Sequence, residues 1–128
     1  MRVAIIGSRS IQLDSLQELL AALPRSTHEI VSGGAAGADQ IAEQVAQELS
    51  LPITVFRPDY AHYQRRAPLQ RNESIVQYAD YVIALWDGTS RGTAHVVERC
   101  IKEYTPVRVF LCRDGKLMQT LFGKDRLL

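Results

Sequence analysis

A chain of 128 residues accommodates one domain and leaves little room for a second. Its composition, 46% hydrophobic and 23% charged, is that of a globular protein with a buried core, and no apolar run approaches the roughly 20 residues that a membrane span needs. The formal net charge of +1 disfavours a protein dedicated to duplex nucleic acid, which usually carries a large positive excess.

The first segment has the pattern of a buried strand. Arg2–Gly7 is a continuous apolar run that ends at a glycine, as in a strand covered on both faces. This run is too short for a signal peptide, so we expect the protein to stay in the cytoplasm. A helical pattern follows, which Pro24 ends. Its apolar stripe consists of Leu13, Leu16, Leu20 and Leu23.

Two further strands are expected on either side of the clearest helix in the chain. Glu29–Ser32 runs into a pair of glycines, and Ile53–Phe56 is opened by Pro52. Between them the apolar residues recur at helical spacing. These residues are Ala38, Ile41, Ala42, Val45, Ala46 and Leu49. A loop of little periodicity is expected over residues 57–66.

The same alternation continues in the second half of the chain. Tyr81–Trp86 and Val107–Cys112 are predicted as strands. The helix before the first of these strands carries a stripe of Asn72, Ile75, Val76 and Ala79. The helix between the two strands carries a buried stripe of Val97, Cys100, Ile101 and Tyr104. Residues 113–115 are typical of a turn, so residues 115–128 are expected to form a short C-terminal extension or a hairpin.

Strands that alternate with helices predict right-handed crossovers. The fold class expected for residues 1–128 is therefore α/β, as one Rossmann-like domain. Its sheet is mostly parallel, with five strands or, counting the hairpin, one more, and helices cover both faces. Either common doubly wound strand order fits this succession of elements.

Glycines and small hydroxyl residues gather where the predicted strands end. Three loops have this makeup: Gly7–Ser10, Ser32–Asp39 and Asp87–Thr93. All strand-to-helix loops of a parallel sheet leave at the same edge, where ligands bind. The free N–H groups of helix starts and the close approach that glycine allows suit an anion. The alternative is that the glycines only make tight turns and the hydroxyls cap helices. Three such loops on one edge favour a binding site.

Basic and aromatic side chains mingle in the loop after the third strand. They are Arg57, Tyr60, His62, Tyr63, Arg65 and Arg66. Such a loop can cover a phosphate and stack on a base, although an ordinary solvated loop explains the pattern equally well. Arg71 and Asn72 differ, because they open a helix directed at the edge where the loops gather, and there a planar cation can clamp a phosphate.

Several known kinds of site are absent from the sequence. There is no Walker A motif and no G-x-G-x-x-G after the first strand, which argues against a P-loop NTPase and an ordinary NAD-dependent dehydrogenase. His28 and His62 lack partners at metal-ligand spacing, so neither a metal nor a cofactor is predicted. Cys100 and Cys112 fall on apolar patterns and are expected to be buried thiols.

Five short motifs in order resemble the SLOG superfamily. They are Gly7-Ser8-Arg9, the segment from Ser32 to Asp39, Arg71-Asn72, Ala79-Asp80 and Ser90-x-Gly92-Thr93. The chain is most similar to small bacterial stand-alone members of YspA type, and more distantly to the LOG cytokinin-activating phosphoribohydrolases and the DNA-processing protein DprA. The resemblance covers residues 2 to about 112. It implies a Rossmann-like sheet and a site for nucleotides or nucleotide-derived ligands.

The residues expected to contact that ligand come from the three loops described above and from the helix start at Arg71 and Asn72. They are Gly7, Ser8, Arg9, Ser32, Gly33, Gly34, Gly37, Asp39, Arg71, Asn72, Asp87, Ser90, Gly92 and Thr93.

The chain departs from the LOG enzymes at one position that matters for catalysis. In those enzymes an Arg near the third helix and a Glu three residues after the Gly-Thr pair serve hydrolysis of the ribose–base bond. Arg71 matches the first, but Val96 stands at the second. Glu98 lies two residues later, which is roughly 200° further around a helix. A hydrolase would need another acid, and the candidates are Asp39, Asp87 and Glu73.

Three functions are open at this point. The first is a binding or sensor domain for a nucleotide-like small molecule. The second is an enzyme that cleaves an N-glycosidic or phosphoribosyl bond, with Arg71, Asp39 and Asp87 as its catalytic residues. The third is DprA-like binding of single-stranded DNA, which the low net charge disfavours. No membrane is expected as a partner. A homodimer that shares a site between subunits is a further expectation that the resemblance implies.

Overall fold

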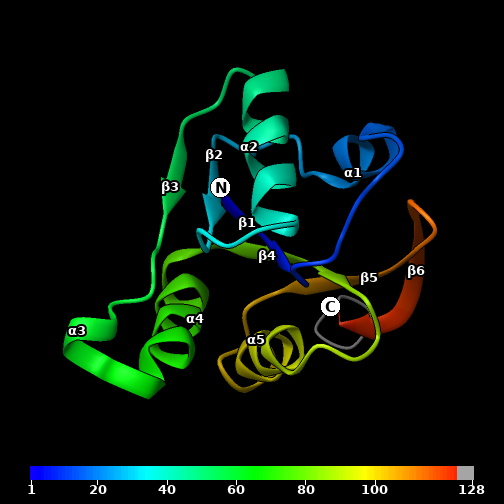
Figure 1. Ribbon diagram of the computed structural model, residues 1–128. Coiled ribbons are helices and arrows are strands. Elements are labelled where there is room, and N and C mark those ends of the chain that lie inside the picture. The colour runs from blue at the N-terminus through cyan, green and yellow to red at the C-terminus, as the bar shows by residue number, and fades with distance from the viewer. Residues whose placement is uncertain (124–128) are drawn as a thin grey trace.

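Strands and helices alternate along the chain, as Figure 1 shows. The computed structural model describes residues 1–123, with side chains up to residue 118, so residues 124–128 of the predicted C-terminal extension lie outside the described part. The strands are β1 (Arg2–Gly7), β2 (Glu29–Ser32), β3 (Ile53–Val55), β4 (Tyr81–Trp86), β5 (Val107–Arg113) and β6 (Lys116–Gly123). The helices are α1 (Gln17–Ala22), α2 (Ala38–Glu48), α3 (Tyr60–Tyr63), the 3₁₀ helix η1 (Gln64–Arg66), α4 (Ala67–Tyr78) and α5 (Arg91–Lys102).

The six strands form one sheet in the order β3-β2-β1-β4-β5-β6. The first five are parallel, and β6 pairs antiparallel with β5. This confirms the predicted α/β fold with a mostly parallel sheet, and of the two doubly wound orders it selects the one that begins 3-2-1-4. Asp114 (φ 52°) and Gly115 (φ 77°) connect β5 to β6, and two residues with positive φ suit a tight hairpin turn.

Each face of the sheet has its own hydrophobic core. Val3, Ile5 and Ile83 belong to the core that α1 and α2 cover, whereas Ala4 and Val82 belong to the core beneath α4 and α5. The two sets alternate along each strand because successive side chains point to opposite faces. Figure 1 shows α1 and α2 on one side of the sheet and α4 and α5 on the other. The strands are thus buried on both faces, which explains their continuous apolar runs.

Two details differ from the sequence-based expectations. The segment 57–66 contains the helix α3, which is capped by the Asp59 side chain accepting a hydrogen bond from the His62 amide at 3.1 Å. Tyr104 is not part of the buried stripe of α5, and the prediction that it is buried is wrong. The residue lies beyond the helix end in the left-handed conformation (φ 57°), which closes the helix and leaves its side chain 85% exposed.

The two cysteines bear out a smaller expectation. Cys100 and Cys112 are both buried free thiols, as predicted, and they lie in different cores on opposite faces of the sheet. Burial raises the pKa of Cys100 to about 12 and that of Cys112 to about 11. Within residues 1–123, no helix has the length and apolar character required to cross a bilayer.

Candidate functional site

The two central strands, β1 and β4, are paired to their carboxyl ends, and the chain leaves them in opposite directions. β1 connects through α1 to β2 on one side, whereas β4 connects through α5 to β5 on the other, so the gap between them is the switch point where open α/β sheets bind ligands. Gly7 pairs with Leu85 at this edge. A Cβ at Gly7 would overlap the carbonyl oxygen of Leu85. Glycine is therefore required here to keep the two strand ends together.

The loops after β1 and β2 also lie directly against each other. Gly37 precedes α2 with φ 70°, a conformation that side chains rarely adopt. A Cβ at this position would overlap the carbonyl group of Arg9 and come within 2.7 Å of the carbonyl oxygen of Ser8. The start of α2 is thus packed on the backbone of the Gly7–Ser10 loop.

Asp39 organises the loop after β2 from the first turn of α2. Its side chain is buried and accepts hydrogen bonds from the Ser32 hydroxyl (2.7 Å), the Gly33 amide (2.9 Å) and the Ala35 amide. Each of these bonds uses a different donor of the same loop, and both carboxylate oxygens are occupied. A buried carboxylate satisfied in this way is a structural anchor for the loop.

Arg71 links α4 to that same loop. Its Nη1 donates to the Gly33 carbonyl oxygen, and its Nε donates to the Asn72 side chain at 2.8 Å. The Asn72 amide nitrogen lies 3.5 Å from Nδ1 of His95, so α4 and α5 approach each other at this point. Burial lowers the pKa of Arg71, with Asp39 raising it and Arg9 lowering it. The guanidinium remains charged at neutral pH because its ordinary pKa is so high.

A chain of hydroxyl groups joins the loops after β1 and β4. The Ser8 hydroxyl accepts a hydrogen bond from the Asp87 amide (3.2 Å) and lies 3.4 Å from the Thr93 hydroxyl. The Thr93 hydroxyl in turn donates to Ser90 Oγ at 3.2 Å. Trp86, at the end of β4, donates its indole N–H to the Ser90 carbonyl at 3.0 Å. These bonds fix the start of α5 beside the end of β1.

Asp87 shapes the turn that precedes α5. One of its carboxylate oxygens accepts the backbone amides of Thr89 (2.9 Å) and Ser90 (2.8 Å). These two bonds hold the pKa of the Asp87 carboxyl below its usual range. The group is therefore ionised at neutral pH, and it stabilises the turn as an acceptor.

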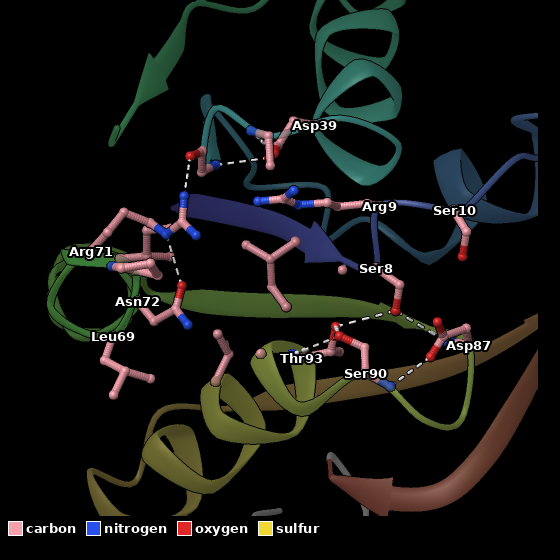
Figure 2. Close-up of a pocket in the computed structure, with 18 residues that line it drawn as sticks. Ser8, Arg9, Ser10, Asp39, Leu69, Arg71, Asn72, Asp87, Ser90 and Thr93 are labelled. Carbon is pink, nitrogen blue, oxygen red and sulfur yellow. Dashed lines mark hydrogen bonds between the residues drawn. The ribbon is translucent and has the colours of Figure 1, made fainter. Parts of the chain in front are cut away.

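The loops enclose a cavity of about 430 Å³ at the switch point. That volume falls within the ~300–1,000 Å³ typical of small-molecule sites. Figure 2 shows Arg9 reaching across the end of β1 toward Arg71, with Ser8, Ser90 and Thr93 grouped at the other end. Of the residues predicted to contact a ligand, the wall contains Gly7, Ser8, Arg9, Gly33, Asp39, Arg71, Asn72, Asp87, Ser90, Gly92 and Thr93. Ser32, Gly34 and Gly37 lie behind this wall and support it.

Seven further residues of the wall were not among the ligand contacts predicted from the sequence, although Ser10 and Ala35 lie in the predicted loops. They are Ile6, Ser10, Ala35, Pro68, Leu69, Ile75 and Val96. Most are small or apolar and belong to patterns that also describe an ordinary core, so only the fold reveals their place. The basic and aromatic residues of segment 57–66 are not part of the wall.

The charged groups of the cavity divide into two kinds. Both carboxylates, Asp39 and Asp87, are bonded to backbone amides of their own loops. Arg9 and Arg71 form no ion pair with a carboxylate among the described side chains. The cavity therefore presents two guanidinium groups that no carboxylate pairs directly, although Asp39 acts on Arg71 from a greater distance. In the described part of the chain, no group of three or more His, Cys, Asp or Glu could hold a metal ion.

Comparison with known proteins identifies one family. Residues 1–99 match the family described as DNA recombination-mediator protein A. No curated protein and no solved structure matches the chain. The matched region runs from β1 into α5 and includes every loop that lines the cavity. It supports the resemblance to the SLOG superfamily, while the likeness to YspA-type members remains a prediction. The chain belongs to the DNA recombination-mediator protein A family.

Proposed function

We propose that the protein binds a nucleotide or a nucleotide-derived, phosphate-bearing ligand in this cavity, as a binding or sensor domain. The observation that carries the proposal is the convergence of Arg9, Arg71 and the start of α5 on one cavity at the switch point. Guanidinium groups bind phosphate with two parallel hydrogen bonds, and a helix start offers free amides and partial positive charge.

The start of α5 is suited to bind a phosphate at the end of the cavity where the hydroxyl groups lie. Ser90 caps the helix by accepting the Thr93 amide, at 3.4 Å. Gly92 lines the cavity, and apart from its chain neighbours and the nearby backbone of α5 no atom lies within 4 Å of the place where its Cβ would be. A ligand can therefore approach the first helical turn without meeting a side chain.

The rest of the wall suits the sugar and base of such a ligand. Ile6, Ile75, Val96 and Leu69 supply apolar surface next to the polar end. Small-molecule sites commonly combine an apolar wall with a few polar groups that fix orientation. A nucleotide has this same division between its phosphate and its base.

Hydrolysis of a ribose–base bond is less well supported than binding. The carboxylates of Asp39 and Asp87 serve their own loops, and Val96 stands where a LOG enzyme has its Glu. The lowered pKa of Asp87 makes it a poor proton donor at neutral pH. If the protein is nevertheless a hydrolase, incubation with nucleoside monophosphates releases free base, and D87N abolishes the release.

Single-stranded DNA is a second candidate ligand, and family membership favours it. The phosphates of a DNA strand present the same chemistry to Arg9 and Arg71 as a free nucleotide. The two ligands differ in salt dependence, because a strand that contacts many cations releases many counterions on binding. A steep loss of oligonucleotide affinity with salt, together with weak binding of mononucleotides, would favour DNA.

Isothermal titration calorimetry tests the proposal. The protein is titrated with AMP, ADP-ribose and an oligothymidylate, at low and high salt. We expect a mononucleotide or dinucleotide to bind wild type. R71A should bind it much more weakly, and R25A, which removes an exposed arginine outside the cavity wall, should bind it as wild type does. Absence of binding for every ligand would overturn the proposal.

A further inference from the structure

His95 lies near the start of α5, beside the cavity and outside its wall. The residue is partly buried, and its neighbour in sequence, Val96, lines the cavity. Nδ1 of the His95 ring lies 3.5 Å from the side-chain nitrogen of Asn72. The Asn72 oxygen accepts a hydrogen bond from Nε of Arg71 at 2.8 Å, as Figure 2 shows. A series of polar contacts thus runs from α5 to the guanidinium that the proposed function uses.

The donors and acceptors in this series determine which nitrogen of the His95 ring carries the proton. An arginine Nε can only donate, so the Asn72 atom that faces it has to be Oδ1. The other end of the amide, Nδ2, can only donate, so it requires an acceptor at Nδ1 of His95. The contact is therefore a long hydrogen bond when the ring proton is on Nε2, and a repulsive pair of donors when a proton is on Nδ1.

We propose that His95 is a positioning residue for Arg71. By accepting a hydrogen bond from Asn72, it holds the amide with Oδ1 toward the guanidinium and so keeps the planar fork directed into the cavity. The inference rests on the proposed function, in which Arg71 binds the phosphate of a nucleotide. It assigns a role to a residue of α5 that itself does not touch the ligand.

The burial of Asn72 makes the orientation of its amide depend on His95. Asn72 is only 6% exposed, and a buried polar group that loses its partner is costly. Without the acceptor on His95, the amide can turn over and present its nitrogen to Nε of Arg71, which removes the bond between them. The bond from Nη1 of Arg71 to the Gly33 carbonyl then remains as the hydrogen bond that restrains the guanidinium. A less restrained cation loses more freedom when a phosphate binds, so affinity falls.

The position of the ring proton can be measured without any ligand. Imidazole ¹⁵N spectra of the labelled protein are recorded at about pH 8, where histidine rings are neutral. The His95 signals are identified as those absent from H95N, which separates them from the signals of His28 and His62. We expect the proton of His95 on Nε2. A proton on Nδ1 would overturn the proposal.

Titration calorimetry with AMP tests the effect on binding. H95L removes the acceptor and fills a similar volume, whereas H95N retains an oxygen acceptor near the place of Nδ1. H95A removes the acceptor with a smaller side chain and serves if H95L fails to fold. E98Q, an exposed change on the same helix, is the matched control. H95L is also combined with R71A, because a residue that acts through Arg71 has no effect once Arg71 is absent.

We expect H95L to weaken AMP binding by about three- to tenfold, the effect of one lost hydrogen bond, and H95N to recover most of the affinity. E98Q should bind as wild type does, and H95L should cause no further loss in R71A. Three results would overturn the role of His95 and leave the proposed function standing: no weakening by H95L, equal weakening by H95N, or an equal further loss in R71A. Failure of wild type to bind AMP or any other nucleotide overturns both.

Discussion

The guanidinium of Arg71 donates a hydrogen bond to the backbone carbonyl of Gly33 and so joins helix α4 to the loop after β2. A second bond, from its Nε to the Asn72 side chain, fixes the orientation of the planar fork. The cationic group is thus held in place before any ligand arrives. Such preorganisation lowers the entropic cost of binding, because the side chain has little freedom left to lose.

Replacing Arg71 tests this arrangement. R71A should weaken nucleotide binding by about 10- to 100-fold, since it removes charged hydrogen bonds to the phosphate. R71K keeps the charge but cannot reproduce the planar fork, so its affinity should lie between those of R71A and wild type. Titration calorimetry measures all three. Equal affinity of R71K and wild type would show that a positive charge alone is sufficient for phosphate binding and that the planar fork is not needed.

Asp39 should prove to be a structural residue. D39N keeps the shape of the side chain but replaces one acceptor oxygen by a donor, which then faces the amide of Gly33 or Ala35. We expect the free energy of unfolding to fall by about 2–4 kcal/mol, measured by urea titration. E43Q, an exposed change on the same helix, should leave stability within about 0.5 kcal/mol of wild type. A fully stable D39N would contradict the anchoring role.

Two glycines at the site should respond to alanine in opposite ways. The Cβ of G7A overlaps the Leu85 carbonyl, so this variant should lose about 2–4 kcal/mol of stability. The Cβ of G92A meets open space within α5, and stability should stay the same or rise by up to about 1 kcal/mol. Because Gly92 lines the cavity, an added methyl group should narrow it, and G92A should bind nucleotide less tightly. Thermal unfolding and calorimetry separate the two effects.

The edge of the sheet opposite the cavity should make stability sensitive to acid. Tyr78 and Thr54 donate hydrogen bonds to Glu29, at 2.6 and 2.9 Å, and the Tyr78 bond is the main cause of the lowered pKa of Glu29. The Asp80 carboxylate accepts the Arg2 amide at 2.7 Å, and its pKa is lowered in the same direction. Both carboxylates therefore bind protons more readily in the unfolded chain.

Glu29 and Asp80 contribute fully to the free energy of unfolding above their ordinary pKa values, near pH 4. This contribution is lost as the pH falls through the lower pKa values that the two groups have in the folded protein. E29Q should flatten this dependence in urea titrations between about pH 3 and pH 7. An unchanged slope for E29Q would rule out Glu29 as a source of the acid sensitivity.

The parts of the fold that the sequence predicts are those governed by local pattern. The apolar runs of β1 and β4 and the spacing of Ile41 and Val45 in α2 identify their elements, because strands buried on both faces and amphipathic helices leave clear periodic signals. Strand order leaves no such signal, since it depends on which edges meet in space. Tyr104 was misplaced for a related reason: its spacing continues the helical stripe, but the chain leaves the helix after Lys102.

The residues of the site also divide into those that the sequence reveals and those that it does not. Polar members such as Arg71 and Thr93 are recognisable from residue type and from their place after a strand or at a helix start. Leu69 and Val96 are not, because an apolar residue that faces a cavity has the same local pattern as one that faces the core. The role of Asp39 could not be predicted from the sequence, since its carboxylate meets three donors of its own loop only in the folded protein.

The central claim is that the loops after β1, β2 and β4 bind one nucleotide together. Backbone ¹H–¹⁵N spectra of the labelled protein, recorded during a titration with AMP, test this most directly. We predict the largest shifts at the amides of Gly7–Ser10, of Gly33 and Ala35, and of Gly92–Thr93, which line the same cavity. Shifts confined to the opposite edge of the sheet, near Pro24 and Pro106, or no shifts at saturating AMP, would contradict the claim.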